Sequence, residues 1–371
     1  MQEADFLALA APGLGDLRAY DPGLDLVALR RVHPGLVELG SNENALGPGP
    51  AARAAAQAAL ATMHVYPDPA GGELKAALAA HHGVDSSQLV LGNGSHELLM
   101  MLAQAFAGPG RGVVASEFGF AVYALAAKAA GAHLVQAPAR PDDDPMPRGH
   151  DLDALAAAVG PGTRLVYLAN PNNPTGTWFQ TAALEAFLAG LPGDVITVVD
   201  EAYLEYVTDP ALASAIGLLG RFPRLVVTRT FSKAHGLAGL RLGYLVAQPG
   251  LVAVLERLRE SFNANAVALA AARAALGDTA HLARVRRENA AEREALADAL
   301  RARGLPVHPS QTNFLLVGFG RDAAPLAQGL VARGIVPRPM AGYGLPGHLR
   351  VTVGTRGQNR RFLRALDEVL A

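Results

Sequence analysis

The regular alternation of short apolar runs with helix-patterned segments is the feature that most constrains the fold of this chain. Seven such runs, each bounded by turn residues, lie at 89–94, 112–116, 133–137, 165–169, 195–200, 225–230 and 242–247. Apolar runs of this length that alternate with helices are typical of parallel strands buried on both faces. We therefore predict an α/β fold with a seven-stranded, mostly parallel sheet in an α/β/α sandwich.

The residues on both sides of this central part have a different pattern. The Ala-rich segments 51–64 and 71–83 predict helices. Beyond residue 250 the pattern predicts helices at 251–262, 267–278 and 279–304. It then predicts strands around a further helix, at 312–319, 334–340 and 348–355. We expect an N-terminal arm (1–45), a large domain (46–255) and a smaller α+β domain (256–371), with the arm packed on the small domain or on a partner subunit.

Composition and charge argue against several classes of protein. The net charge of −1 does not suggest a surface for nucleic acid or an anionic membrane, and no stretch approaches the ~20 apolar residues of a membrane span. The chain has no cysteine, which excludes disulfides, a thiol nucleophile and thiolate metal ligands. The N-terminus lacks the basic segment of a signal peptide. We expect a cytoplasmic protein that acts on small molecules without a metal.

Lysine is scarce, which makes the position of Lys233 informative. Only three lysines occur among the 32 basic residues. Lys75 and Lys128 lie in Ala-rich helical segments and are predicted to occupy solvated helix faces. Lys233 instead follows a predicted strand, among the small and polar residues of TFSKAHGLAGLR (230–241). If the protein condenses with an aldehyde or ketone, Lys233 is the expected amine.

Polar side chains also follow two other predicted strands. Asp200 ends the run VITVVD, Tyr203 lies three residues later, and Asn173 belongs to ANPNNPTG (169–176). Ligands of open α/β sheets bind beyond the carboxyl ends of the strands, so these side chains can face one ligand. A carboxylate there is costly without a cation, and Asp200 suits a protonated heterocycle. Taken singly, the Asn173 signal is equally consistent with a turn alone, and the alternative for Asp200 is a helix cap or a partner for a nearby arginine.

Two further groups at the strand ends suit an anion. Gly94 lets a ligand approach the main chain, and Ser95 is the predicted N-cap of a helix whose first N–H groups are free. Thr230, Ser232 and Arg241 add hydroxyl groups and a guanidinium. An amine, a carboxylate, an amide, a phenol and an anion site are the set that pyridoxal phosphate requires. We predict this cofactor.

These motifs also carry a family resemblance. The succession of ANPNNPTG, DEAY (200–203) and the lysine segment resembles the fold-type I pyridoxal-phosphate aminotransferases. The resemblance covers almost the whole chain, and the segments 41–50, 309–317 and 338–355 are similar to the histidinol-phosphate aminotransferases. It implies the PLP-transferase fold type I, a homodimer with shared active sites, and transamination of L-histidinol phosphate with 2-oxoglutarate in histidine biosynthesis.

The resemblance implies a role for each candidate residue. Lys233 would hold the cofactor covalently and then carry a proton, while Asp200 would pair with the ring nitrogen and Phe120 would stack on the ring. The other cofactor contacts would be Asn173 and Tyr203 at the 3-oxygen, and Gly94, Ser95, His96, Thr230, Ser232, Arg241 and Tyr66 of the partner subunit at the phosphate. The substrate would contact Tyr20, Asn42, Arg338 and Arg350.

Three alternative functions remain. An aromatic amino acid aminotransferase of the same branch would place a carboxylate at the substrate arginines. A pyridoxal-phosphate decarboxylase of a phosphorylated amino acid shares the scaffold. A binding protein that has kept the fold without catalysis is disfavoured, because Lys233, Asp200 and the arginines are intact. His96 departs from the acid or amide common in the family, and Phe120 replaces a tyrosine of many relatives.

Overall fold

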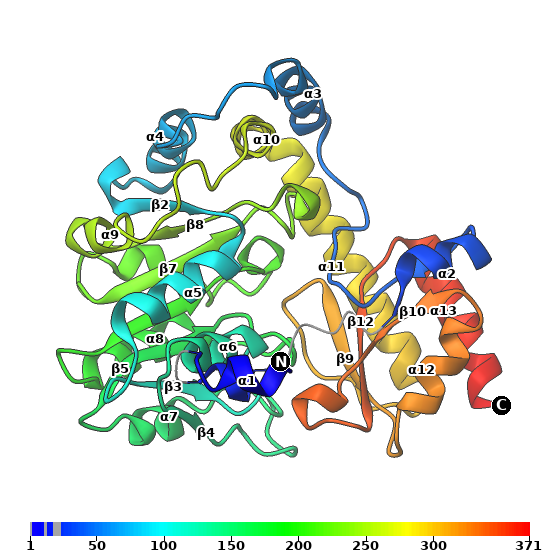
Figure 1. Ribbon diagram of the computed structural model, residues 1–371. Coiled ribbons are helices and arrows are strands. Elements are labelled where there is room, and N and C mark those ends of the chain that lie inside the picture. The colour runs from blue at the N-terminus through cyan, green and yellow to red at the C-terminus, as the bar shows by residue number, and fades with distance from the viewer. Residues whose placement is uncertain (1, 11–12, 18–23) are drawn as a thin grey trace.

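The computed structural model describes residues 2–10, 13–17 and 24–371. Its main sheet has the strand order β2-β8-β7-β6-β5-β3-β4, and β8 runs antiparallel to both of its neighbours (Figure 1). The other neighbouring pairs are parallel. The strands are β2 (Leu89–Gly92), β3 (Gly112–Ser116), β4 (Leu134–Ala137), β5 (Thr163–Ala169), β6 (Ile196–Asp200), β7 (Leu225–Thr230) and β8 (Gly243–Val246). The predicted seven-stranded, mostly parallel sheet is confirmed.

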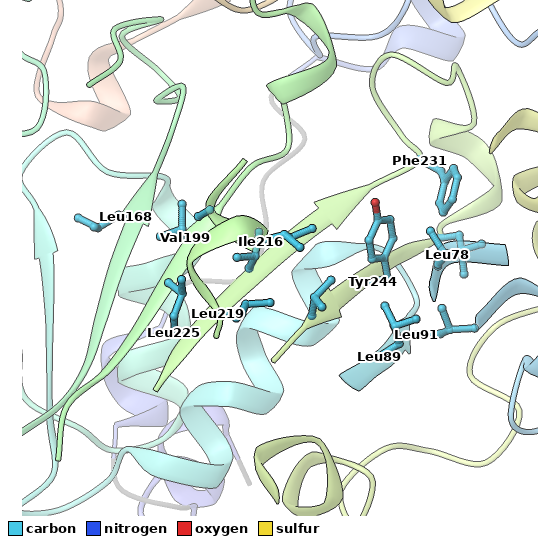
Figure 2. Packing of buried hydrophobic residues seen from close by; sticks show 14 of the residues in the cluster. Leu78, Leu89, Leu91, Leu168, Val199, Ile216, Leu219, Leu225, Phe231 and Tyr244 are labelled. Carbon is cyan, nitrogen blue, oxygen red and sulfur yellow. The ribbon is translucent and has the colours of Figure 1, made fainter. Parts of the chain in front are cut away.

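Helices cover both faces of this sheet, which explains why its strands are apolar throughout. Val113 packs in one buried cluster and its neighbour Val114 in another, because successive side chains of a strand point to opposite faces. Figure 2 shows part of the second cluster, where Leu168, Val199 and Leu225 of adjacent strands lie together. The first cluster contains residues of α5 (Ser95–Phe106), α6 (Ala121–Ala129) and α9 (Pro249–Leu255), and the second contains residues of α4 (Gly72–His82), α7 (Leu152–Ala158), α8 (Thr181–Gly190) and α10 (Ala266–Gly277).

A smaller antiparallel sheet lies beside the main one and has the order β11-β12-β9 (Figure 1). It consists of β9 (Phe314–Gly318), β11 (Arg338–Pro339) and β12 (His348–Thr352). Buried residues of α11 (Thr279–Arg301), α12 (Ala324–Val331) and α13 (Arg356–Leu370) form one cluster with its strands. Helix α11 runs from the end near α10 towards this sheet (Figure 1). The predicted long charged helix and the predicted strands are therefore present.

The N-terminal segment contributes little regular structure but joins the smaller sheet region. Strand β1 (Val37–Glu38) pairs in parallel with β10 (Ile335–Val336). The remaining helices are α1 (Glu3–Leu7), α2 (Leu26–Val32) and α3 (Pro50–Ala59), and the 3-10 turns are Leu14–Asp16, Leu60–Thr62, Ser86–Gln88, Leu204–Tyr206, Ala215–Leu218, Ala238–Leu240 and Ala341–Tyr343. Across the described parts of the chain, none of the helices has the length and apolar character needed to cross a bilayer.

Several local expectations need correction. Ser95 is the first residue of α5, and Gly94 is its N-cap, so the start of this helix lies one residue earlier than predicted. Lys75 does not lie on a solvated face, because its side chain is only 14% exposed and pairs with Glu256 at 2.8 Å. Lys128 is exposed, as predicted. The final helix α13, which begins with the capping box of Thr355, was not predicted.

Candidate active site

A cleft of about 330 Å³ lies where the carboxyl ends of the central strands meet the smaller sheet. The structure brings most of the predicted residues to this cleft, although they come from widely separated parts of the chain. Those that line it are Asn42, Ser95, His96, Phe120, Asn173, Asp200, Tyr203, Thr230, Ser232, Lys233, Arg241, Arg338 and Arg350. The fold therefore gathers an amine, a carboxylate, an amide, a phenol and three guanidinium groups around one space.

Lys233 lies just beyond the end of β7, on the wall of the cleft. Its Nζ donates a hydrogen bond to Ser41 O at 3.1 Å and lies 5.8 Å from the centre of the Tyr203 ring. Burial, followed by the nearby Arg350 guanidinium, lowers the pKa of Lys233 to about 8. An amine with this pKa can give and take a proton near neutral pH, and its neutral form is a nucleophile.

Asp200, the last residue of β6, is buried below the cleft. Tyr123 donates a hydrogen bond from its hydroxyl to Oδ2 of Asp200 at 3.2 Å, whereas Oδ1 has no partner within the described structure. Burial raises the pKa of Asp200 to about 6, although the hydroxyls of Thr228 and Tyr123 and the charge of Lys233 oppose this rise. A carboxylate with one free buried oxygen suits a cationic N–H donor.

The phosphate end of the predicted site is built from glycines, hydroxyls and Arg241. Gly94 has a positive φ of 81°, and a Cβ there would lie 2.5 Å from Nη2 of Arg241. A Cβ at Gly243 would lie 2.5 Å from the main-chain nitrogen of Ser95. Only glycine leaves this end of α5 open for an anion. Arg241 donates to Ser232 Oγ at 3.3 Å and to Ala238 O, so its charge has no carboxylate partner there.

Tyr203 and Asn42 form a second polar group that lines the cleft. Asn42 donates from Nδ2 to the Tyr203 hydroxyl at 3.0 Å, so this hydroxyl keeps its own proton available for a ligand. Burial raises the pKa of Tyr203 to about 12, which keeps the phenol neutral at physiological pH. Asn42 adopts a positive φ of 55° and is held by Thr352 and Asn313, residues of the smaller sheet region.

Two arginines of the smaller sheet face the same cleft. Arg338 of β11 and Arg350 of β12 are directly opposite each other in the antiparallel ladder. Arg350 is buried and donates to Asn173 Oδ1 and to Gly40 O, each at 2.6 Å, while its Nε has no partner among the described residues. Burial lowers the pKa of Arg350, and Arg338 adds to this effect. These uncompensated charges create a strong preference for an anionic ligand.

Phe120 and His96 complete the lining on the side of α5 and α6. The Phe120 ring contacts the Tyr123 ring edge-on, with centroids 5.9 Å apart. His96 lies in the first turn of α5, where partial burial and the Arg241 charge lower the pKa of its imidazole. Thr230 is buried and accepts a hydrogen bond from the main-chain nitrogen of Ser232 at 3.1 Å, which shapes the turn before Lys233.

One predicted residue that the structure describes, Tyr66, does not line the cleft. Tyr66 is 80% exposed and stacks on Phe262 with ring centroids 4.6 Å apart, away from the residues that line the site. Its predicted role requires a partner subunit. Tyr20 lies outside the residues that the structure describes.

Sequence reasoning missed three contributors to the site. Tyr123 binds Asp200, Tyr343 lines the cleft beside Arg350, and Ser41 accepts the hydrogen bond from Lys233 through its carbonyl. Tyr343 lies within the family-like segment 338–355, and Tyr123 lies in FAVYALAAKAAGA (120–132), which also resembles the family, so their hydroxyls were the available signal. The Ser41 carbonyl left no signal, because any residue there offers the same main-chain atom.

Comparison of the sequence with known protein families identifies the family of this chain. A sequence profile of the class I and II aminotransferases matches residues 34–366. The chain belongs to the class I and II aminotransferases. It is therefore an enzyme, a pyridoxal-phosphate-dependent aminotransferase, and its large sheet is that of the fold-type I transferases.

Individual relatives of this aminotransferase are similar over nearly their whole length. Histidinol-phosphate aminotransferase 2 of Pseudomonas aeruginosa is 48% identical, with 99% of each chain covered. The crystal structure of histidinol-phosphate aminotransferase from Sinorhizobium meliloti in complex with pyridoxal-5'-phosphate has a TM-score of 0.87 and 33% identity, and 97% of each chain is covered. L-threonine-O-3-phosphate decarboxylase from Porphyromonas gingivalis has a TM-score of 0.76 and 26% identity, with 90% of this chain and 99% of that chain covered.

Proposed function

We propose that this aminotransferase transfers the amino group of L-histidinol phosphate to 2-oxoglutarate, which gives imidazole-acetol phosphate and glutamate in histidine biosynthesis. The observation that carries the proposal is the opposed pair Arg338 and Arg350, which line the same cleft as Lys233. Within the described parts of the chain, neither arginine forms an ion pair with a carboxylate. Two such guanidinium groups suit a phosphate ester in one half-reaction and a dicarboxylate in the other. The similarity to the Pseudomonas aeruginosa protein supports this substrate.

The residues of the cleft fit pyridoxal phosphate. The free Oδ1 of buried Asp200 offers an acceptor for the ring nitrogen, and Gly94 and Gly243 leave space for the phosphate at the start of α5. Arg241 adds a cation there, and Lys233 supplies the amine. When bound, this cofactor supplies an aldehyde for covalent attachment and a ring that accepts electrons. Phe120 would stack on that ring, while Asn173 and Tyr203 would bond its 3-oxygen.

The remaining chemistry belongs to the protein itself. We propose that the Lys233 amine moves a proton to and from the substrate carbon, for which a pKa of about 8 is well placed. Asp200 would hold the cationic ring nitrogen of the bound cofactor, which would keep the ring electron-poor. Arg350 fixes the substrate anion from the smaller sheet, so that the reacting carbon faces the Lys233 amine. Asn42 lies between the two sheets and orients Tyr203.

We also propose a homodimer in which Tyr66 of the partner subunit completes each cofactor site. Tyr66 and its stacking neighbour Phe262 lie on the surface, together with a run of exposed apolar side chains from Leu60, Met63 and Val65. A contiguous exposed apolar patch is typical of a protein interface. We also propose a cytoplasmic location.

The proposed domain division follows from the buried clusters. Two clusters belong to the large sheet and its helices, and a third belongs to the smaller sheet. Because residues from Ala264 to Ala275 pack in a large-sheet cluster, we propose that the large domain extends beyond the predicted boundary at residue 255 to Asp278, the N-cap of α11. The N-terminal arm joins the small domain through the pairing of β1 with β10.

The test of this function is a comparison of amino donors at equal concentration with 2-oxoglutarate as acceptor. Phenylalanine offers the two arginines no phosphate to bind. We therefore expect kcat/KM for histidinol phosphate to exceed that for phenylalanine by at least about 100-fold. Equal values would favour the aromatic aminotransferase. The likeness to the Porphyromonas gingivalis decarboxylase makes phosphothreonine a second substrate to test, and release of CO2 from it would favour a decarboxylase.

A further inference from the structure

We propose that Tyr123 is a positioning residue that holds the Asp200 carboxylate ionised and directs its free oxygen at the cofactor. This inference rests on the proposed function for the identity of the group that Asp200 binds. It adds a residue for which no role was predicted. Both residues are buried, with Tyr123 only 1% and Asp200 only 4% exposed.

The hydrogen bond between the two residues fixes the orientation of the carboxylate. The Tyr123 hydroxyl forms a hydrogen bond with Oδ2 of Asp200 at 3.2 Å. An ionised carboxylate can only accept, so the phenol must donate. With Oδ2 engaged, Oδ1 is the oxygen left without a partner. A carboxylate tied at one oxygen cannot rotate freely, and its other oxygen is set for the ring nitrogen.

The Tyr123 ring is itself held tightly on two sides. It stacks on Tyr167 of β5 with centroids 4.9 Å apart and planes 3° apart. Its other contact is the edge-on ring of Phe120, the N-cap residue of α6. Tyr123 therefore lies one helical turn after the residue proposed to stack on the cofactor. The first turn of α6 thus links the group above the cofactor ring to the acid that binds its nitrogen.

Tyr123 is not the only group that favours the ionised form of Asp200, and the main-chain N–H of Ala202 also lowers its pKa. Lys233, beyond β7, supplies a favourable charge, and Thr228 of β7 supplies a hydroxyl. The hydroxyl of Tyr203, which follows β6, accepts a hydrogen bond from Asn42 instead. Because burial already disfavours the charged carboxylate, loss of the Tyr123 hydroxyl raises the pKa of Asp200 further above about 6. More of the acid is then neutral at physiological pH.

The experiment compares Tyr123→Phe with Tyr167→Phe, which is a matched control in the same stack. Tyr167 is equally buried, but its hydroxyl donates to Leu99 O at 2.8 Å and not to Asp200. Both variants are prepared as full chains, stripped of cofactor, and titrated with pyridoxal 5'-phosphate between about pH 5.5 and pH 8.5 to obtain Kd at each pH. The protonated Asp200 carboxyl is followed separately in the cofactor-free proteins by its infrared C=O band, which Asp200→Asn identifies.

For the wild type we expect affinity to fall as the pH drops through about 6, the pKa of Asp200. In Tyr123→Phe the fall should begin about one pH unit higher, with affinity about twofold weaker near pH 7, about fivefold weaker near pH 6, and recovering by about pH 8.5. The infrared band should shift in the same direction by the same amount. Tyr167→Phe should keep the wild-type profile.

The outcomes separate this inference from the proposed function. A Tyr123→Phe profile equal to the wild type, or an equal shift in Tyr167→Phe, would overturn the positioning role while the aminotransferase assignment stands. A wild-type protein that binds no pyridoxal 5'-phosphate at any pH would instead remove the proposed function. The infrared measurement still decides the Tyr123–Asp200 linkage in that case, because it needs no cofactor.

Discussion

At the scale of single residues, the site keeps groups that destabilise the empty protein. Asp200 is buried with one oxygen unpaired, and Arg350 is buried without an acid. Such groups persist in a fold when a ligand supplies the missing partner. The stability of the cofactor-free protein should reveal this cost directly.

Asp200→Asn should therefore stabilise the cofactor-free protein while it impairs turnover. The folded-state pKa of Asp200, about 6, lies above the ordinary value of 3.8, so the folded chain binds this proton more tightly than the unfolded chain. The penalty is absent below the ordinary pKa and complete once the pH has risen above the folded pKa. We expect a gain of about 3 kcal/mol in the free energy of unfolding near pH 8, which disappears near pH 4.

Urea unfolding at a fixed protein concentration measures this difference at each pH. Asp143→Asn is the control, because Asp143 is exposed and its replacement should change little. If Asp200→Asn were less stable than the wild type at high pH, the ionised acid would be well compensated and the argument from burial would fail.

Arg338 should determine the preference for a phosphate group. It is exposed at the rim of the cleft, opposite buried Arg350, so its removal should spare the fold. We expect Arg338→Ala to raise KM for histidinol phosphate about tenfold or more, since a charge-assisted contact contributes on the order of 1.5–3 kcal/mol. Arg333→Ala, which removes an exposed partner of Glu368, is the control and should leave KM unchanged. Unchanged KM in both variants would mean that Arg338 does not contact the phosphate.

The sequence indicated individual site residues well where chemistry and place in a motif agreed. Lys233 was singled out because lysine is rare and this one follows a strand, and the structure places it in the cleft. Tyr123 was missed because its contact with Asp200 joins residues 77 apart in the chain. That contact exists only after α6 has packed against the sheet. The predicted environment of Lys75 was wrong for the same reason, since its partner Glu256 lies far away in the chain, at the end of α9.

At the scale of elements, an internal ion-pair network ties β7 to the segment after β6. Arg229 of β7 donates to Glu201 at 3.1 Å and to Glu205 at 2.6 Å, and all three side chains are at most 8% exposed. Glu201 also accepts a hydrogen bond from the main-chain nitrogen of Ala215. Because Glu201 follows Asp200 directly, this network fixes the end of β6 on the face opposite the cleft.

Arg229→Met should therefore destabilise the protein strongly, because it leaves two buried carboxylates without a cation. We expect a loss of about 3–5 kcal/mol in the free energy of unfolding, measured by urea denaturation at neutral pH. Arg221→Ala removes a more exposed partner, that of Glu185, and should cost less than about 1 kcal/mol. Similar costs for the two variants would show that the buried network contributes no more than a surface pair.

The elements themselves were predictable to different degrees. The seven strands were found because each is an apolar run between turns, a signal that does not depend on the partners of the strand. Helix α13 was not predicted, although Phe362, Ala365 and Leu366 mark one apolar face, because arginines and acids dominate its sequence. The one-residue error at Ser95 reflects the glycine N-cap, whose role depends on backbone geometry and not on a side-chain acceptor.

At the scale of the whole molecule, the proposal of a shared active site makes a quantitative prediction. Lys233→Ala and Tyr66→Ala subunits should each form dimers of low activity. In a hybrid dimer, one site carries both substitutions and the other carries none. If the subunits exchange at random, the mixture should recover about a quarter of wild-type activity.

The recovery is measured after co-refolding equal amounts of the two variants with limiting cofactor. Lys233→Ala mixed with itself is the control and should stay inactive. A mixture that shows no more than the mean activity of its two components would contradict a site shared across the interface, because each subunit would then contain its whole site.

The identity of the lysine that binds the cofactor tests the proposed active site most directly. The purified enzyme is loaded with pyridoxal 5'-phosphate, reduced with borohydride, digested and analysed by mass spectrometry. We expect a stable pyridoxyl group on Lys233 and its loss in Lys233→Ala. A protein that stays colourless and unlabelled, or that carries the group on Lys75 or Lys128 instead, would contradict the proposed active site.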